Sequence, residues 1–365
     1  MNQVNQTARP TRIAAWDLLK LFAIFLVVYG HCMQHLLEVD TRYNPMFLWI
    51  TSFHMPLFMT LSGLFARNSF RASFKDYFMK RGRQVLLPCL SWSLIIFAVI
   101  VILGGDLQIY TIKSFAINSL WFLKSVFVCG ILGFIAFKSQ RNRVMWVVLT
   151  LLLSQVILIW NVFIMYPCFL FGICIFKYLS WILKYKCLVL VISGLLFMVF
   201  SLYVSFSPNF WVRDQGIREA LFSGTLSLMD NALFLMKVIL KRYFQLFIGL
   251  LGSSFFITLF FLLFTGLRNV YLLNLAKLGQ YTLGVYVIQS LILETILVRW
   301  ISFSSDYFWS FDFVIAPLIS LLIVYVCLFI NKVIVFKEGK LATLLLESHV
   351  RKLLMISCRD FCYVI

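Results

Sequence analysis

A strongly apolar segment near the N-terminus contains three ionisable side chains. The segment WDLLKLFAIFLVVYGH, residues 16–31, includes Asp17, Lys20 and His31. Ionisable groups are costly inside a bilayer and usually face the interior of a helix bundle or a wet cavity. On a helix, Lys20 and His31 share one face and lie about 16 Å apart along the axis, with Asp17 near the same face. We therefore expect one stripe of this helix to line a cavity that ends at His31.

A second histidine lies in the next apolar segment, SFHMPLFMTLSG, residues 52–63. This segment must run antiparallel to the first, which brings His54 to about the depth of His31. Pro56 should bend the helix beside it. An imidazole can act as a general base or as a nucleophile, so His31 and His54 are the catalytic candidates. The alternative for either residue is an interhelical hydrogen bond.

Basic residues near the ends of the predicted helices form a candidate anion site. Lys80, Arg81 and Arg83 lie in KRGRQ, directly before the third apolar segment. Together with Lys20, they have the chemistry to bind a polyanion through charge-assisted hydrogen bonds to phosphate. Two alternatives remain. The cluster before the third segment could only fix topology, and Lys20 could form an ion pair with Asp17 at the end of the membrane span.

Composition indicates an all-α polytopic membrane protein. Of the 365 residues, 62% are hydrophobic and 13% are charged, and the mean hydropathy is +0.95. Such values lie outside the range of soluble domains. The net charge of +18 arises from short basic clusters between apolar segments, so we expect no nucleic-acid binding. The nine cysteines form neither a CxxC pair nor a Cys/His cluster with zinc spacing, so we expect no metal site and no disulfides.

Ten apolar segments are long enough to cross a membrane. Ten crossings place both termini on one side. The N-terminus, the tail and the loops on that side hold 22 of the 32 Lys and Arg residues, which predicts that this side is cytoplasmic. The expected spans are 13–37, 46–66, 85–103, 116–137, 144–160, 162–179, 186–206, 243–266, 277–300 and 312–331.

Two segments lie outside this pattern. Residues 207–242 contain an apolar segment interrupted by Asp230 and Asn231, which we interpret as an interfacial or re-entrant element on the outer face. Residues 337–365 form a basic tail, and the fit of its last four residues to a prenylation motif is attributed to chance. We therefore expect a membrane-embedded domain over 1–336 and a cytoplasmic tail over 337–365.

Several motifs in matching order resemble the acyltransferase-3 family of integral membrane acyltransferases, which includes bacterial O-acetyltransferases of surface polysaccharides. The resemblance covers about 13–300, and two departures occur. The usual arginine pair before the third helix is replaced by Lys80 and Arg83, and Gln289 stands where many relatives have His. The motifs are DLLKLFAIFLVVYGH (17–31), FHMPLFMTLSG (53–63), KRGRQVLLP (80–88), LWFLKSVF (120–127), YPCFLFGI (166–173) and LGQYTLGVYVIQS (278–290).

The resemblance implies transfer of an acetyl group from cytoplasmic acetyl-CoA to a sugar hydroxyl of a surface polysaccharide, such as O-antigen or capsule, in the bacterial inner membrane. The acceptor is expected to be a lipid-linked glycan surrounded by membrane lipids. His31 would act as general base or carry the acetyl group, His54 would orient His31 or polarise the thioester carbonyl, and Lys20, Lys80, Arg81 and Arg83 would bind the CoA phosphates. Asp17, Trp121, Tyr286 and Glu294 are candidates for substrate binding, although aromatic residues in spans also serve packing.

Two other functions fit a polytopic chain. A polysaccharide polymerase or flippase of envelope glycan assembly also has many spans, but a polymerase should show a large outer loop with Arg-rich motifs. A proton-coupled transporter would use Asp17, Lys20 and His31 as a relay. It should also show inverted repeats and paired broken helices, which the sequence lacks.

Overall fold

The computed structural model describes residues 14–105, 109–139, 141–207, 228–266 and 269–336. This part of the chain is helical and contains no β-strand, only an isolated bridge between Leu37 and Phe303. The all-α polytopic prediction is confirmed. Both termini lie outside the described residues, so their cytoplasmic location stays a prediction. Within the described ranges, nine helical segments are long and apolar enough to span a membrane: Ala14–Leu36, Pro45–Arg71, Phe74–Ile102, Trp121–Lys138, Val162–Lys184, Lys186–Ser205, Met236–Phe264, Val270–Arg299 and Phe308–Ile334.

Most predicted spans overlap these helices closely, and three parts of the prediction differ. The predicted span 144–160 corresponds to α7 (Arg143–Val156), an apolar helix of 14 residues that is shorter than the other nine. The helical segment that corresponds to the predicted span 85–103 begins earlier than predicted, at Phe74. Its helix α4 (Leu87–Ile102) continues without a break from α3 (Phe74–Arg81) through the π-helical segment η3 (Gly82–Leu86).

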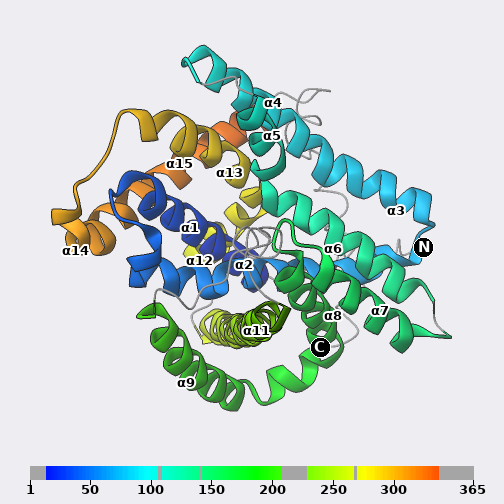
Figure 1. Ribbon diagram of the computed structural model, residues 1–365. Helices are drawn as coiled ribbons and strands as arrows, with labels where there is room; N and C mark the ends of the chain where they lie inside the picture. Colours follow the sequence, from blue (N-terminus) through cyan, green and yellow to red (C-terminus); the bar gives the residue numbers. More distant parts are fainter. Residues whose placement is uncertain (1–13, 106–108, 140, 208–227, 267–268, 337–365) are drawn as a thin grey trace, which may run out of the picture.

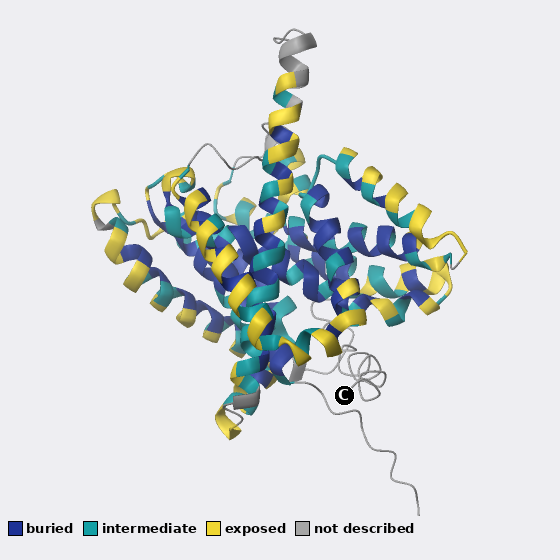
Figure 2. Ribbon diagram, turned by 90° about the horizontal axis from the view of Figure 1, so that it is seen from below, coloured by how far each residue is buried: buried dark blue, intermediate teal, exposed yellow. Residues whose placement is uncertain are grey.

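The third difference concerns the segment 207–242. Residues 208–227 lie outside the described residues, but 228–242 belong to α11 (Leu228–Gly266), a continuous helix of 39 residues that includes the span predicted at 243–266. Figure 2 shows α11 extending beyond the rest of the helices. For 228–242, the interpretation as a separate interfacial or re-entrant element is therefore wrong. The polar residues Asp230 and Asn231 do not end the helix, because the regular apolar pattern continues on either side of them.

The centre of the bundle is the close packing of α2 (Pro45–Ala66) against α8 (Val162–Lys184). Gly63 of α2 faces the backbone of Phe169, and Gly172 of α8 faces the backbone of Thr60. A Cβ atom at either glycine would overlap a carbonyl oxygen of the other helix. Small residues at a helix crossing allow such close approach, and dispersion contacts then stabilise helix pairs in lipid.

The remaining helices surround this pair on two sides. On one side of α2 lie α9 (Lys186–Ser205) and α11. On the other side lies α1 (Ala14–Leu36), which packs against α12 (Val270–Leu278), α13 (Thr282–Gln289) and α15 (Ala316–Phe336) (Figure 1). Segments from the two ends of the described chain therefore meet in space, because the first helix packs against these late ones.

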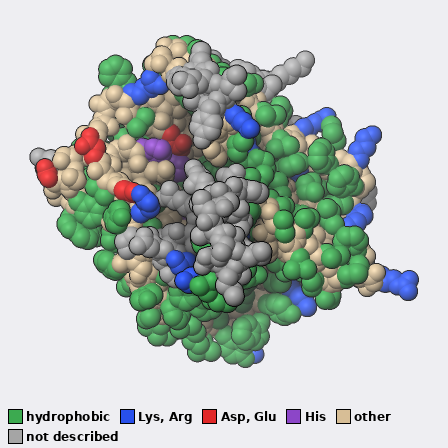
Figure 3. All heavy atoms as spheres, in the orientation of Figure 1, with side chains coloured by type: hydrophobic (Ala, Val, Ile, Leu, Met, Phe, Trp, Pro, Cys, Tyr) green, Lys and Arg blue, Asp and Glu red, His purple; other side chains and the backbone are tan. Residues whose placement is uncertain are grey.

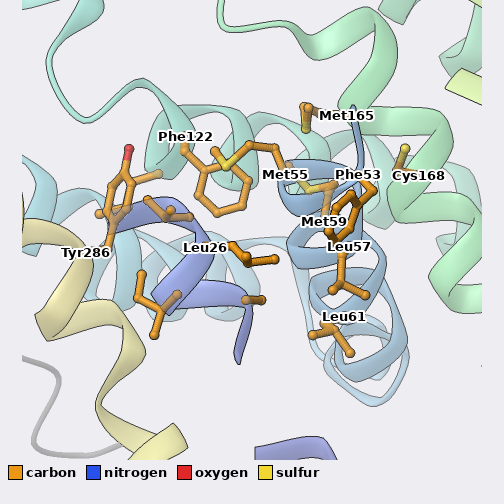
Figure 4. Packing of buried hydrophobic residues seen from close by; sticks show 14 of the residues in the cluster. Leu26, Phe53, Met55, Leu57, Met59, Leu61, Phe122, Met165, Cys168 and Tyr286 are labelled. Carbon is orange, nitrogen blue, oxygen red and sulfur yellow. The ribbon is translucent and has the colours of Figure 1, made fainter. Parts of the chain in front are cut away.

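The apolar side chains divide between a packed core and the periphery. Buried residues fill the centre of the bundle, and exposed ones occupy its outer helices (Figure 2). In the core, Phe122 of α6 (Trp121–Lys138) packs against Tyr286 of α13, and Leu57 of α2 is fully buried (Figure 4). Large apolar residues such as Leu195 on α9 and Leu318 on α15 are exposed. An apolar periphery is what contact with lipid requires.

Candidate functional site

Helix α1 and a segment far away in sequence bring His31 and Glu294 together. The Nδ1 atom of His31 lies 2.6 Å from Oε1 of Glu294. A carboxylate oxygen only accepts hydrogen bonds, so the Nδ1–H group of His31 is the donor. The side chains are 24% and 28% exposed, respectively, so the pair is accessible at one edge. Figure 3 shows histidine side chains beside acidic side chains on the surface of the molecule.

A change of helix type positions Glu294. Residues Ser290–Ile296 form a π-helical segment, η6, that continues α13. Gln289 and Glu294 are five residues apart, which on an α-helix would separate them by about 140°. The π-helix has hydrogen bonds between residues i and i+5 and stacks such a pair on one face. Accordingly, Nε2 of Gln289 donates to Oε1 of Glu294 over 3.2 Å.

Gln289 stabilises the position of the Glu294 carboxylate. Its side chain is fully buried, and its Nε2 atom also donates to the Tyr286 carbonyl over 3.2 Å. An amide cannot accept and release a proton as an imidazole does. Gln289 therefore orients the carboxylate of Glu294 and does not transfer a proton.

The His31 and Glu294 pair has the chemistry of a general base with an orienting carboxylate. With the Nδ1 proton held by Glu294, the neutral ring presents the Nε2 lone pair to a substrate. When Nε2 takes up a proton, the nearby carboxylate stabilises the imidazolium. Within the described part of the chain, the polar contacts of the His31 ring both involve Nδ1, which lies 2.6 Å from Oε1 of Glu294 and 3.5 Å from Nε2 of Gln289. The arrangement can therefore remove a proton from a hydroxyl group or attack a carbonyl carbon.

His54 lies at the same end of the bundle but in a different environment. Its side chain is buried in α2, and its Nδ1 atom donates to the Ile50 carbonyl over 2.9 Å. The expected similar depth of His54 and His31 stays a prediction. Because Nδ1 carries the proton, Nε2 of the neutral ring is only an acceptor. The neutral ring therefore cannot polarise a carbonyl through Nε2.

At the other end of α1, Asp17 and Lys20 form an ion pair. Their side-chain atoms Oδ1 and Nζ lie 3.5 Å apart, and the Lys20 ammonium lies 4.5 Å from the centre of the Phe65 ring. Asp17 is buried, and Lys20 is partly exposed. The ion-pair alternative for these two residues is therefore realised. The exposed part of Lys20 remains accessible to an anionic group.

The face of α1 between Lys20 and His31 is closed. Ile24 and Val27, which lie between them on this face, are each 1% exposed. The expected cavity along this stripe is therefore not present in the described structure, because neighbouring helices cover the apolar residues between the two polar ends. A ligand reaching from Lys20 to His31 must separate these helices or follow another face.

The second basic cluster lies elsewhere in the bundle. Lys80 and Arg81 end α3, and Arg83 is exposed on η3. The guanidinium of Arg81 lies 5.8 Å from the centre of the Tyr77 ring. Segment η3 packs mainly against α3, α4 and α6, whereas α1 packs mainly against α2, α12 and α15. Lys20 and the three residues of α3 and η3 therefore lie on helices with different main packing partners, and a common anion site stays a prediction.

The two aromatic candidates differ in accessibility. Tyr286 is buried, and its ring packs edge-on against Phe122 with centroids 6.0 Å apart. This is the environment of a core residue. Trp121, at the start of α6, is partly exposed and can contact a ligand at the bundle surface.

Sequence reasoning did not include His35 in the site and missed a second group of polar residues. His35 lies one turn after His31, and ligand atoms of His31, His35 and Glu294 all lie within 4.8 Å of one another. Separately, the fully buried Asp312 accepts a hydrogen bond from Asn44 over 3.2 Å, and its carbonyl accepts one from Tyr29. Each group joins residues more than 250 positions apart, so spacing along the chain gave no signal.

Comparison with known proteins identifies relatives. Residues 13–332 match the sequence profile of a family described as an acyltransferase domain. Nodulation protein NolL of Mesorhizobium japonicum is 31% identical over 152 residues, 38% of this chain and 39% of that protein. NolL of Sinorhizobium fredii is 38% identical over 89 residues, 23% of this chain and 24% of that protein. Each alignment thus spans less than half of the relative. No solved structure matches the chain significantly.

Proposed function

Because the chain belongs to the acyltransferase-3 family, we propose that this multi-pass membrane protein is an O-acetyltransferase of the bacterial inner membrane. It moves an acetyl group from cytoplasmic acetyl-CoA to a sugar hydroxyl of a lipid-linked surface polysaccharide, such as O-antigen or capsule. Family membership favours acyl transfer over the polymerase, flippase and transporter interpretations. The observation that carries the proposal is the hydrogen bond between His31 and Glu294, which prepares a general base at an accessible edge.

In the proposed reaction, Nε2 of His31 removes the proton from the sugar hydroxyl while Glu294 holds Nδ1. The hydroxyl oxygen attacks the thioester carbonyl carbon, the carbon–sulfur bond breaks, and the departing thiolate takes the proton from Nε2. The products are the acetyl ester and CoA. In a two-step version, Nε2 first carries the acetyl group as an acyl-imidazole. The arrangement of His31 and Glu294 supports either route.

The donor is proposed to bind through its phosphates near Lys20, at the opposite end of α1 from His31. Lys80, Arg81 and Arg83 are retained as donor-binding candidates on α3 and η3. The closed face at Ile24 and Val27 must open, or be bypassed, when the thioester reaches His31. His54 is proposed to position His31, since its Nδ1 proton is engaged by Ile50.

Acetyl content of the surface glycan tests this proposal. The glycan is isolated from cells with and without the protein and from cells that express the His31→Ala variant at equal abundance. We expect acetyl esters only with the wild-type protein, because the variant lacks the base. Equal acetylation with and without the protein would contradict the proposed function, and full acetylation by the variant would remove His31 from the mechanism.

A further inference from the structure

His31, His35 and Glu294 have the composition and arrangement of a zinc-binding group. His31 and His35 are one turn apart on α1, and their rings lie 5.9 Å apart, centroid to centroid. Glu294 faces them from η6, and the ligand atoms of all three lie within 4.8 Å of one another. Two histidines at positions i and i+4 of a helix present their nitrogens to a single ion. Two His and one Glu are an established ligand set for Zn²⁺.

The surroundings also suit a cation that arrives from water. The side chains of His31 and Glu294 are each about a quarter exposed. His35 is partly buried. Imidazole ligands favour Zn²⁺ over hard cations such as Mg²⁺, which prefer oxygen ligands and retain their waters.

Binding of Zn²⁺ at this group and general-base catalysis by His31 exclude each other. Zinc lies about 2.0–2.1 Å from nitrogen ligands in a tetrahedral site, which places neighbouring ligand atoms about 3.3 Å apart. Nδ1 of His31 and Oε1 of Glu294 are 2.6 Å apart and share a proton. An ion bound by these atoms must therefore displace this proton and lengthen the contact. The hydrogen bond that orients His31 is then lost.

We infer that His31, His35 and Glu294 form a reversible Zn²⁺ site whose occupation inhibits acyl transfer. The inhibitory part rests on the proposed function, whereas binding of the ion does not. The inference assigns a role to His35, which the proposed reaction does not use. It also gives the enzyme sensitivity to zinc in the aqueous phase that its exposed edge contacts.

Binding is tested first, without any activity measurement. Zn²⁺ is titrated into the purified protein by calorimetry, in parallel with His35→Gln and with the control Gln34→Ala, which alters an exposed neighbour on α1. Loss of a ligand should weaken zinc binding roughly tenfold or more in His35→Gln, and Gln34→Ala should match the wild type. Equal zinc binding by wild type and His35→Gln, or no binding by the wild type at micromolar zinc, would overturn the site.

The second arm measures acyl transfer by the same proteins. We expect Zn²⁺ to inhibit the wild type, EDTA to restore its activity, and Mg²⁺ to have no effect. His35→Gln should keep its basal rate and require at least tenfold more zinc for half inhibition. Stimulation by zinc, or equal inhibition of wild type and His35→Gln, would overturn the inhibitory role. If neither the wild type nor the variants show transferase activity but zinc binding depends on His35, the zinc site is confirmed and the proposed function is wrong.

Discussion

The imidazole of His31 and the carboxylate of Glu294 form a 2.6 Å hydrogen bond between residues separated by 263 positions in the sequence. This contact joins the first helix to a π-helical segment near the end of the described chain. It fixes which ring nitrogen of His31 carries the proton and leaves the other available to a substrate. The proposed acyl transfer depends on that pairing.

Replacing Glu294 by Gln should lower kcat by roughly 10²–10⁴ and leave KM for the acceptor nearly unchanged, because the lost charge no longer stabilises the protonated His31 ring. Steady-state transfer assays on the purified protein measure both constants. Glu38→Gln is the matched control, since Glu38 is exposed and accepts a hydrogen bond from Ser302. A Glu294→Gln variant as active as Glu38→Gln would show that the carboxylate does not assist the base.

His54→Asn should reduce kcat only about tenfold. The asparagine amide can replace the Nδ1–H donor to the Ile50 carbonyl, so helix α2 keeps its shape. Removal of a general base costs about two to four orders of magnitude, a much larger effect. Rates of the His54→Asn and His31→Asn variants are compared at equal protein concentration. Equal loss in the two variants would place His54 in contact with the reacting atoms.

Lys20→Ala should raise KM for acetyl-CoA about tenfold with little change in kcat, because one charge-assisted hydrogen bond to phosphate contributes about 1.5–3 kcal/mol. Lys20→Arg should keep most of the affinity. Kinetics at varied donor concentration separate the two constants. If Lys20 served only its ion pair with Asp17, Lys20→Ala and Asp17→Asn would both lower the melting temperature and leave KM unchanged.

Gly172→Ala should destabilise the bundle by about 1–3 kcal/mol, because the added methyl group overlaps the Thr60 carbonyl at the crossing of α2 and α8. Thermal unfolding in detergent, monitored by loss of helical signal or by aggregation, measures the change. Gly82→Ala is the control, since a methyl group at Gly82 would meet no other atom within 4 Å. If Gly172→Ala had the same melting temperature as Gly82→Ala, the α2 and α8 helices could move apart without loss of stability.

Most of the fold could be predicted from the sequence because membrane helices are long, apolar and bounded by charge. The ends of α1, α2 and α9 agree with prediction to within one residue. The path of α11 could not be predicted, because Asp230 and Asn231 suggested an interruption that helix geometry does not require. Local sequence patterns identify polar residues within an apolar segment, but not whether the backbone hydrogen bonds of the helix continue past them.

Individual residues of the site could be predicted from the sequence, but the contacts between them could not. Helical spacing identified His31 as a candidate, yet the same spacing wrongly indicated an open stripe, because the covering of Ile24 and Val27 depends on other helices. Glu294 was expected to bind the acceptor, whereas the structure places it against His31. The π-helical turn that redirects it has no signature in apolar periodicity.

The role of His31 as the base is decided by transfer of labelled acetyl from acetyl-CoA to glycan in membrane vesicles that contain equal amounts of wild-type or His31→Gln protein. We predict that His31→Gln inserts and accumulates normally but transfers acetyl at least about 100-fold more slowly. Transfer by His31→Gln at more than about a tenth of the wild-type rate would contradict the assignment, because loss of a general base costs more than that.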